Sequence, residues 1–92
     1  MTKTEKGARA YRIPTTTTTE DLEELGLTTL TFGERILVAG HTYLGRGNEG
    51  YFGATYRFAT DDRTCEGEVR LEAVSEGLFE DDGHAIAWAI RG

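Results

Sequence analysis

The sequence contains a single cysteine, Cys65, so it can form neither an intramolecular disulfide nor a zinc site with four cysteine ligands. No apolar run is long enough to cross a membrane. The first residues carry charges with no apolar stretch behind them, which is unlike a secretory signal. We therefore expect a cytoplasmic protein without a membrane segment.

Positive charge is scarce after the first twelve residues. Residues 1–12 hold four basic side chains and one glutamate, whereas residues 13–92 hold six basic and fifteen acidic ones. The whole chain has a formal net charge of −6. An acidic body repels phosphate backbones, which argues against direct nucleic-acid binding and favours a partner protein with a basic surface. Acidic charge also keeps small proteins soluble, and that alternative stays open.

The 92 residues suffice for one domain. Residues 1–7 are predicted to be a mobile basic tail, and residues 8–92 a single α+β domain. Ala8 to Ile13 favours a short strand, which Pro14 would end because proline cannot donate to a sheet ladder.

One short helix is expected near residues 19–25. Thr18 is a suitable N-cap, because its hydroxyl can accept a hydrogen bond from a free amide of the first turn. Leu22 and Leu25 are three residues apart and are predicted to share one face. Gly26 suits the left-handed position that follows a helix. So short a helix needs a sheet to pack on.

Alternating apolar and polar residues predict the sheet. Cys65 is placed on the dry face of its strand, where a thiol would be buried and inert. The last segment follows an Asp82-Gly83 hairpin signal. Its alanines would let the short helix approach closely, and a helical conformation of this segment is the alternative. Strands are expected at residues 27–32, 36–44, 52–58, 65–73 and 84–91.

The fold class is therefore α+β: an antiparallel β-meander of four to five strands with one short helix. Its glycines would allow the sheet to curl into a partly open barrel.

Residues 45–50 match the G-x-G-x-x-G spacing of phosphate-binding loops. A dinucleotide fold requires a helix after this motif, whereas residues 51–56 have the pattern of a strand. The motif therefore indicates a flexible hairpin loop. Arg46 at its tip is a candidate partner contact.

No constellation of residues favours catalysis. Cys65, His41 and His84 are far apart in the sequence and carry no local signature of a nucleophile and its base. The acidic pairs lack the spacing of a calcium loop. The sequence thus predicts a protein that is not an enzyme and has no metal and no cofactor.

Acidic side chains are the remaining feature that could bind a partner. Glu66, Glu68 and Glu72 are expected to project from one strand face at roughly 7 Å intervals, similar to the phosphate spacing along one nucleic-acid strand. A solvated outer face is the alternative. The residues predicted to bind a partner are Glu66, Glu68, Glu72, Asp61, Asp62, Glu20, Asp21 and Arg46.

These features predict a non-enzymatic interaction module that occupies a basic, nucleic-acid-binding surface of another protein. In size, acidity and lack of catalytic motifs, the chain is similar to small phage inhibitors such as anti-CRISPR and DNA-mimic proteins. The likeness implies an inhibitor role and rests on composition alone.

A second hypothesis is a small β-barrel that binds or converts a small ligand. Its aromatic pocket would lie around Tyr43 and Tyr56, with Phe52 and Trp88, and His41 would be the polar group. The alternative is that these aromatic residues form the core. A homodimer formed through an uncovered strand edge beside the glycine-rich hairpin fits either hypothesis.

Overall fold

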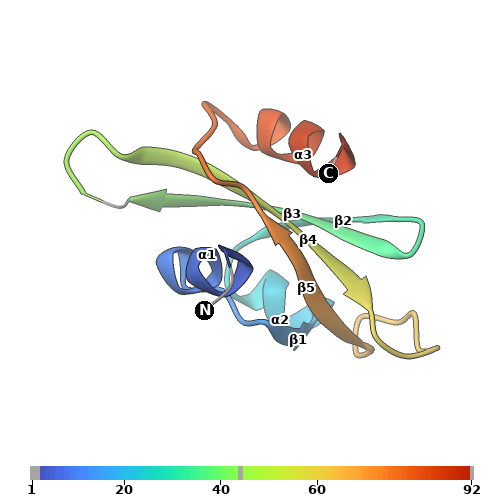
Figure 1. Ribbon diagram of the computed structural model, residues 1–92. Helices are drawn as coiled ribbons and strands as arrows, with labels where there is room; N and C mark the ends of the chain where they lie inside the picture. The colour runs from blue at the N-terminus through green and yellow to red at the C-terminus, as the bar shows by residue number, and fades with distance from the viewer. Residues whose placement is uncertain (1–2, 44, 92) are drawn as a thin grey trace.

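One curled antiparallel sheet carries five strands in the order β1-β5-β4-β3-β2 (Figure 1). The computed structural model describes residues 3–43 and 45–91, with side chains from Lys6 onward. The start of the predicted tail and Leu44, the predicted end of a strand, lie outside the described residues. The α+β class and the antiparallel meander are confirmed. The strands are β1 Thr16–Thr18, β2 Thr28–Phe32, β3 Arg35–Tyr43, β4 Glu49–Phe58 and β5 Glu68–Val74.

Three helices cover the sheet where the sequence predicts one. They are α1 Lys3–Tyr11, α2 Thr19–Glu24 and α3 Asp82–Arg91. α1 and α2 lie on one face of the sheet and α3 lies on the other, so the protein has three layers (Figure 1).

The predicted strand at residues 8–13 is wrong, because residues 8–11 belong to α1 and residues 12–13 follow its end, while residues 3–7 of the predicted tail form the start of the same helix. Ala8 and Tyr11, three residues apart, pack on the core from one face of α1. Gly7 allows α1 to approach β5, since a Cβ atom there would lie 2.9 Å from Val74 Cγ1. The spacing of apolar residues that suggested a strand here therefore comes from the core-facing side of a short helix.

α2 confirms the helix predicted near residues 19–25. The Thr18 hydroxyl accepts a hydrogen bond from the Asp21 amide at 3.2 Å, as an N-cap does. Gly26 has a φ of 83°, as expected for the residue after the helix. Leu22 is fully buried, but Leu25, predicted on the same face, is the C-cap residue and is 57% exposed.

The predicted strand at residues 84–91 is wrong, and the helical alternative is correct. The Asp81 carboxylate accepts a hydrogen bond from the His84 amide at 2.8 Å and so caps α3, where the sequence suggested a hairpin turn. Ala85 and Ala89, one turn apart, are buried against the sheet. The alanines do permit a close approach, but to β3 and β4, because α2 lies on the opposite face (Figure 1).

The predicted burial of Cys65 is also wrong. β5 begins at Glu68, and Cys65 is exposed in the loop before it. Within this loop, the Oδ1 atom of Asp62 accepts hydrogen bonds from the amide and the hydroxyl of Thr64, at 2.9 and 2.6 Å, and so stabilises a polar turn. A polar turn therefore replaces the first three residues of the predicted strand.

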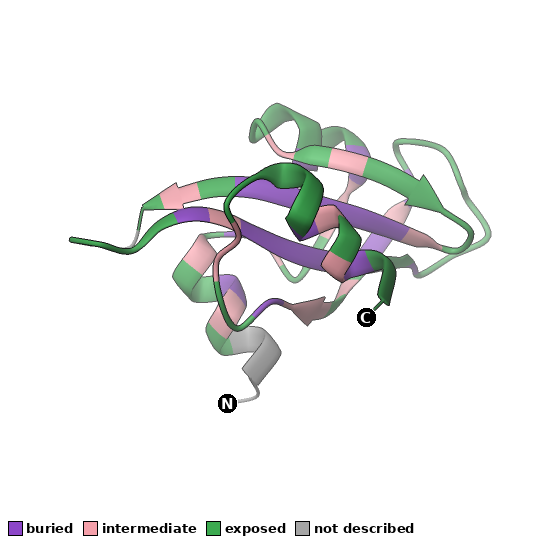
Figure 2. Ribbon diagram, turned by 90° about the horizontal axis from the view of Figure 1, so that it is seen from above, coloured by how far each residue is buried: buried purple, intermediate pink, exposed green. Residues whose placement is uncertain are grey.

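The main core lies between the sheet and the two helices α1 and α2. Buried residues are concentrated along the central strands β3 and β4 (Figure 2). Tyr56 is fully buried, and its hydroxyl donates a hydrogen bond to the Pro14 carbonyl at 2.6 Å. That bond joins β4 to the segment that connects α1 and β1. The buried residues of this core are Ala8, Ile13, Leu22, Ile36, Val38, Phe52, Ala54, Tyr56, Phe58 and Val69.

We expect Tyr56→Phe to reduce the free energy of unfolding by about 1 kcal/mol at neutral pH, because the Pro14 carbonyl loses its donor. Burial raises the pKa of Tyr56, so the folded protein keeps a proton that the unfolded chain releases above a pH of about 10. Stability should therefore fall as the pH rises above that value, and less steeply in Tyr56→Phe.

Urea titrations at neutral and alkaline pH would measure both effects. Tyr43→Phe is the matched control: its ring is exposed, and its neutral-pH stability should stay within about 0.5 kcal/mol of the parent protein. Parallel pH profiles for the parent and Tyr56→Phe would contradict the role assigned to the buried hydroxyl.

Candidate functional site

Five of the predicted partner-binding acids gather at one end of the molecule. Thr18 of β1 pairs with Glu68 of β5, which brings the start of α2 beside the loop that precedes β5. The Glu20 amide donates a hydrogen bond to the Cys65 carbonyl at 3.0 Å and joins the two segments. All five side chains are exposed. We call this group the acidic end: Glu20, Asp21, Asp61, Asp62 and Glu66.

The carboxylates of the acidic end have no basic partner among the described residues. Arg63 belongs to the same loop, but its guanidinium contacts Glu34 at 3.5 Å and lies over the ring of Phe58. It therefore points away from the acids beside it in the sequence. The Asp62 carboxylate holds the turn, and its hydrogen bonds from Thr64 lower its pKa. The acidic end thus has uncompensated negative charge on two backbone segments that are joined to each other.

The predicted row of three glutamates on one strand face does not form. Glu66 precedes β5, and Glu68 contacts Arg70 at 3.2 Å. Glu72 contacts two arginines, one on the neighbouring strand β4 and one on β3 beyond it, with Oε1 at 3.2 Å from Arg57 Nε and 3.6 Å from Arg35 Nε. The pairing register sets Arg35 directly opposite Arg57, so basic side chains lie beside the glutamates of this charged face.

Arg46 occupies the predicted hairpin loop, where Gly45 and Gly47 have φ angles of 122° and 80°. Its side chain is exposed. The loop joins β3 to the start of β4, whereas the acidic end lies beyond the end of β4 (Figure 1). Arg46 and the predicted acids therefore cannot form one small site.

The predicted aromatic pocket is divided between three places. Tyr56 and Phe52 are core residues, and the Phe52 ring stacks on Tyr11 with centroids 4.5 Å apart. Trp88 lies on α3, on the other face of the sheet. Tyr43 and His41 are exposed at the end of β3. The alternative that most of these aromatics serve packing is correct for Tyr56 and Phe52.

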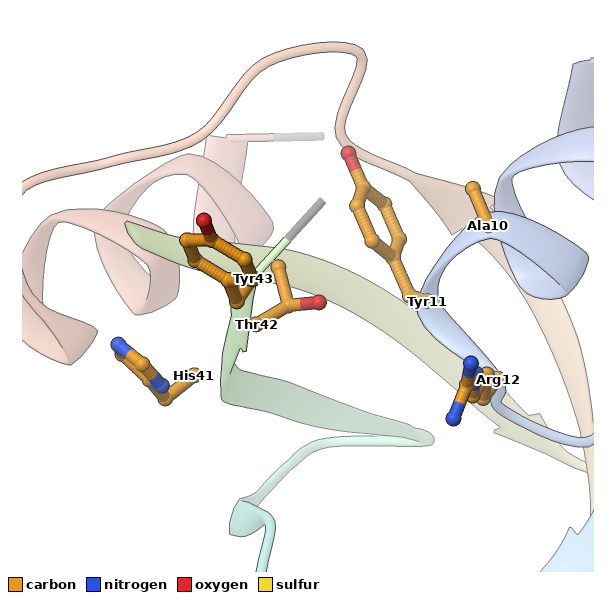
Figure 3. Close-up of a pocket in the computed structure, with 6 residues that line it drawn as sticks. All are labelled: Ala10, Tyr11, Arg12, His41, Thr42 and Tyr43. Carbon is orange, nitrogen blue, oxygen red and sulfur yellow. The ribbon is translucent and has the colours of Figure 1, made fainter. Parts of the chain in front are cut away.

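A hollow of about 550 Å³ lies between the end of α1 and the end of β3, and we call it the α1–β3 hollow (Figure 3). Two of its residues come from sites that the sequence did not single out, Tyr11 and Arg12. Both fall in the strand expected at residues 8–13, which gave no sign that a helix end would lie beside β3. The lining residues are Ala10, Tyr11, Arg12, His41, Thr42 and Tyr43.

The three residues that the sequence offered as a nucleophile and its base, Cys65, His41 and His84, lie in separate places. The Nε2 atom of His41 lies 3.0 Å from Glu49, and the Nδ1 atom of His84 lies 2.8 Å from Asp81 in the cap of α3. Hydrogen bonds from the backbone and then the side chain of His84 lower the pKa of Asp81. Cys65 is in the loop before β5 and contacts neither histidine. Among all the residues that the structure describes, no three histidine, cysteine, aspartate or glutamate side chains form a group that could hold a metal ion.

β2 is an edge strand of a kind that another chain could extend. It carries no charge, and Leu30 and Phe32 are about half exposed. β2 pairs with β3 only over Arg35–Ala39, so residues 40–43 of β3, beside the glycine-rich hairpin, have no described strand on that side. The homodimer, and the edge it would use, stay predictions. No helix in the described part of the chain has the length and apolar character needed to span a membrane.

Comparison with known proteins identifies the family. Residues 13–92 match a family described as nucleotide modification associated domain 4, and this match covers the sheet, α2 and α3. No curated protein and no solved structure matches the chain. Since the match spans most of the sequence, the chain belongs to the nucleotide modification associated domain 4 family.

Proposed function

We propose that this protein is a non-enzymatic module that works beside a nucleotide-modification system and binds a partner protein through the acidic end. The observation that carries the proposal is the junction of α2 with the loop before β5, made by the Glu20 hydrogen bond to Cys65. The family description supports the setting. Its sequence suggests a more specific role, that of an inhibitor that fills a nucleic-acid-binding groove of its partner.

The electrostatics favour a basic partner surface. Carboxylates without a counter-charge attract cationic side chains over roughly 10 Å at moderate ionic strength, and a fixed backbone reduces the entropy lost on binding. A surface that holds nucleic acid is basic, and its lysines and arginines would pair with these acids. Binding should therefore weaken as salt rises.

The test compares two double variants with the same change in net charge. Glu20→Lys with Glu66→Lys reverses two charges of the acidic end and spares Asp62, which holds the turn. Glu24→Lys with Glu80→Lys reverses two exposed acids outside it. Partner proteins would be captured from the native host with the tagged parent protein, with and without nuclease, and then titrated against each variant at several salt concentrations.

We expect the first pair to weaken binding about tenfold, or ~1.4 kcal/mol, and the control pair to change it less than threefold. Equal effects of the two pairs would show that overall charge, not the acidic end, governs binding. Capture that disappears after nuclease treatment would contradict a direct protein contact.

A further inference from the structure

We propose that two copies of this chain associate through β2, whose strands pair antiparallel about a two-fold axis at Leu30. The proposal is independent of the acidic end, because it uses none of those residues. It rests on the free backbone groups of an edge strand, on their symmetric positions about Leu30, and on the absence of charge from the strand.

β2 is the last strand of the sheet, so β3 pairs with one side of it and no described strand pairs with the other. Figure 1 shows that the β2–β3 hairpin extends past the end of α3, so this helix leaves the strand edge open. Natural edge strands are usually protected by charged side chains, by proline or by a bulge. β2 has none of these, and its pairing with β3 is continuous from Thr28 to Phe32. Its edge is therefore suited to another strand.

The pairing pattern shows which backbone groups of β2 are free. The Phe58 amide bonds to the Glu34 carbonyl at 3.3 Å, so the even-numbered residues of β3 bond toward β4. In an antiparallel sheet the direction of these bonds alternates along a strand. The odd-numbered residues of β3 therefore bond toward β2, and the even-numbered residues of β2 bond back to them. The amides and carbonyls of Thr29 and Thr31 are left pointing outward.

Thr29 and Thr31 lie on either side of Leu30, and this symmetry makes β2 complementary to itself. When the two Leu30 residues lie opposite each other, each Thr29 lies opposite the other copy's Thr31. Every outward amide and carbonyl of both strands then has a partner. A shift of register by two residues would place Thr29 or Thr31 opposite a residue outside β2. The geometry therefore selects one register.

The side chains of β2 suit the same pairing. Leu30 is on the face of the sheet that carries α3, and Thr29 is on the other face, where its hydroxyl donates a hydrogen bond to Glu23 of α2 at 3.3 Å. Leu30 is 48% exposed in a single copy. In the pair, each Leu30 would cover the other and each Phe32 would lie opposite Thr28, so burial of apolar area adds to the backbone bonds.

Charge favours a second copy as the occupant of this edge. Each chain has a formal net charge of −6, so two copies repel one another over most of their surfaces. Residues 25–33 contain no charged side chain, so the copies can meet at β2 without opposing carboxylates. A two-fold axis sets each residue near its own copy, and an uncharged strand is the kind that tolerates this.

The first experiment measures association of the full chain. The strand has five residues, so the interface is small and we expect a weak dimer. Sedimentation equilibrium from about 10 µM to 1 mM would give its dissociation constant. Leu30→Lys places two like charges at the axis and should raise that constant by about tenfold or more. Leu25→Lys changes the net charge equally at another exposed leucine, and should stay within about twofold of the parent protein.

A mixture of two variants tests the register. Leu30→Lys and Leu30→Glu should each be largely monomeric alone, because residue 30 meets its own charge. Mixed in equal amounts, they should form a dimer with one copy of each, since opposite charges then meet at the axis. The matched mixture of Leu25→Lys and Leu25→Glu should associate as the parent protein does.

Cysteine cross-linking tests the same register without added charge. In a Cys65→Ser background, Leu30→Cys should form an intermolecular disulfide under mild oxidation with diamide, because the Cα atoms of a non-hydrogen-bonded pair are about 4.5 Å apart. Thr31→Cys should remain largely reduced, because the two copies of residue 31 are offset along the strands by roughly 7 Å.

Four results would each overturn the proposal. They are a parent protein that stays monomeric at about 1 mM, equal effects of lysine at positions 25 and 30, a mixture of the Leu30 variants that stays monomeric, and cross-linking that is as efficient at position 31 as at position 30.

Discussion

Leu22→Ala is expected to reduce the free energy of unfolding by about 3 kcal/mol. Leu22 is fully buried in the core, and the helix that carries it has only six residues. So short a helix has little stability of its own and depends on tertiary packing. Loss of this side chain would therefore leave a cavity and loosen α2 from the sheet.

Leu25→Ala is the matched control, because it removes the same atoms three residues away from a side chain that is 57% exposed. It should cost no more than about 0.5 kcal/mol. Urea denaturation followed by circular dichroism would measure both variants. Similar losses of unfolding free energy in the two variants would contradict the difference in burial between Leu22 and Leu25. They would instead favour the sequence-based prediction that both leucines pack on the sheet from one helix face.

Gly53→Ala should cost about 2 kcal/mol, although alanine normally improves on glycine in a strand. A Cβ atom at Gly53 would lie 2.8 Å from Trp88 Cε3 and 2.9 Å from the Ala85 carbonyl oxygen. Both contacts are too short, so α3 would have to move away from the sheet. The small residue on β4 is thus a condition for the packing of this helix.

Gly77→Ala makes the same chemical change where no heavy atom lies within 4 Å of the added methyl group. It should leave stability unchanged or raise it by up to about 1 kcal/mol. Trp88 is the single tryptophan, so its fluorescence reports how α3 is seated. An unchanged emission spectrum and an unchanged urea midpoint in Gly53→Ala would show that α3 accommodates the methyl group.

Local signals in the sequence predicted α2 correctly. Its cap, its length and the glycine after it depend on neighbours within four residues, and all three are present in the structure. The hairpin loop at residues 45–48 was predictable for the same reason, since its glycines adopt the left-handed conformations that a tight loop needs.

Period-two alternation misled the prediction for α1 and α3. Alanine fits strands poorly but fits helices well, and a run that alternates alanine with larger residues satisfies both patterns. Two features identify α3 as a helix: the Asp81 cap and the burial of Ala85 and Ala89 one turn apart. The cap was visible in the sequence, but the Asp82-Gly83 pair also suited a hairpin turn.

The candidate sites depended on contacts between distant segments. The charges of Glu68 and Glu72 were evident, but their neutralisation follows from ion pairs with arginines on β5 itself, β4 and β3. The α1–β3 hollow likewise needs the end of a helix beside the end of a strand some thirty residues later.

The amino-acid sequence by itself determined the acidic character of the body, the cap and end of α2, and the alternation that makes the central strands. These properties depend on composition or on residues close together in the chain. Only the tertiary structure decided which acids stay unpaired and that the end of α1 lies beside the end of β3. The physical reason is that strand register and helix docking minimise the free energy of the whole core, so they bring together side chains whose local sequences carry no information about one another.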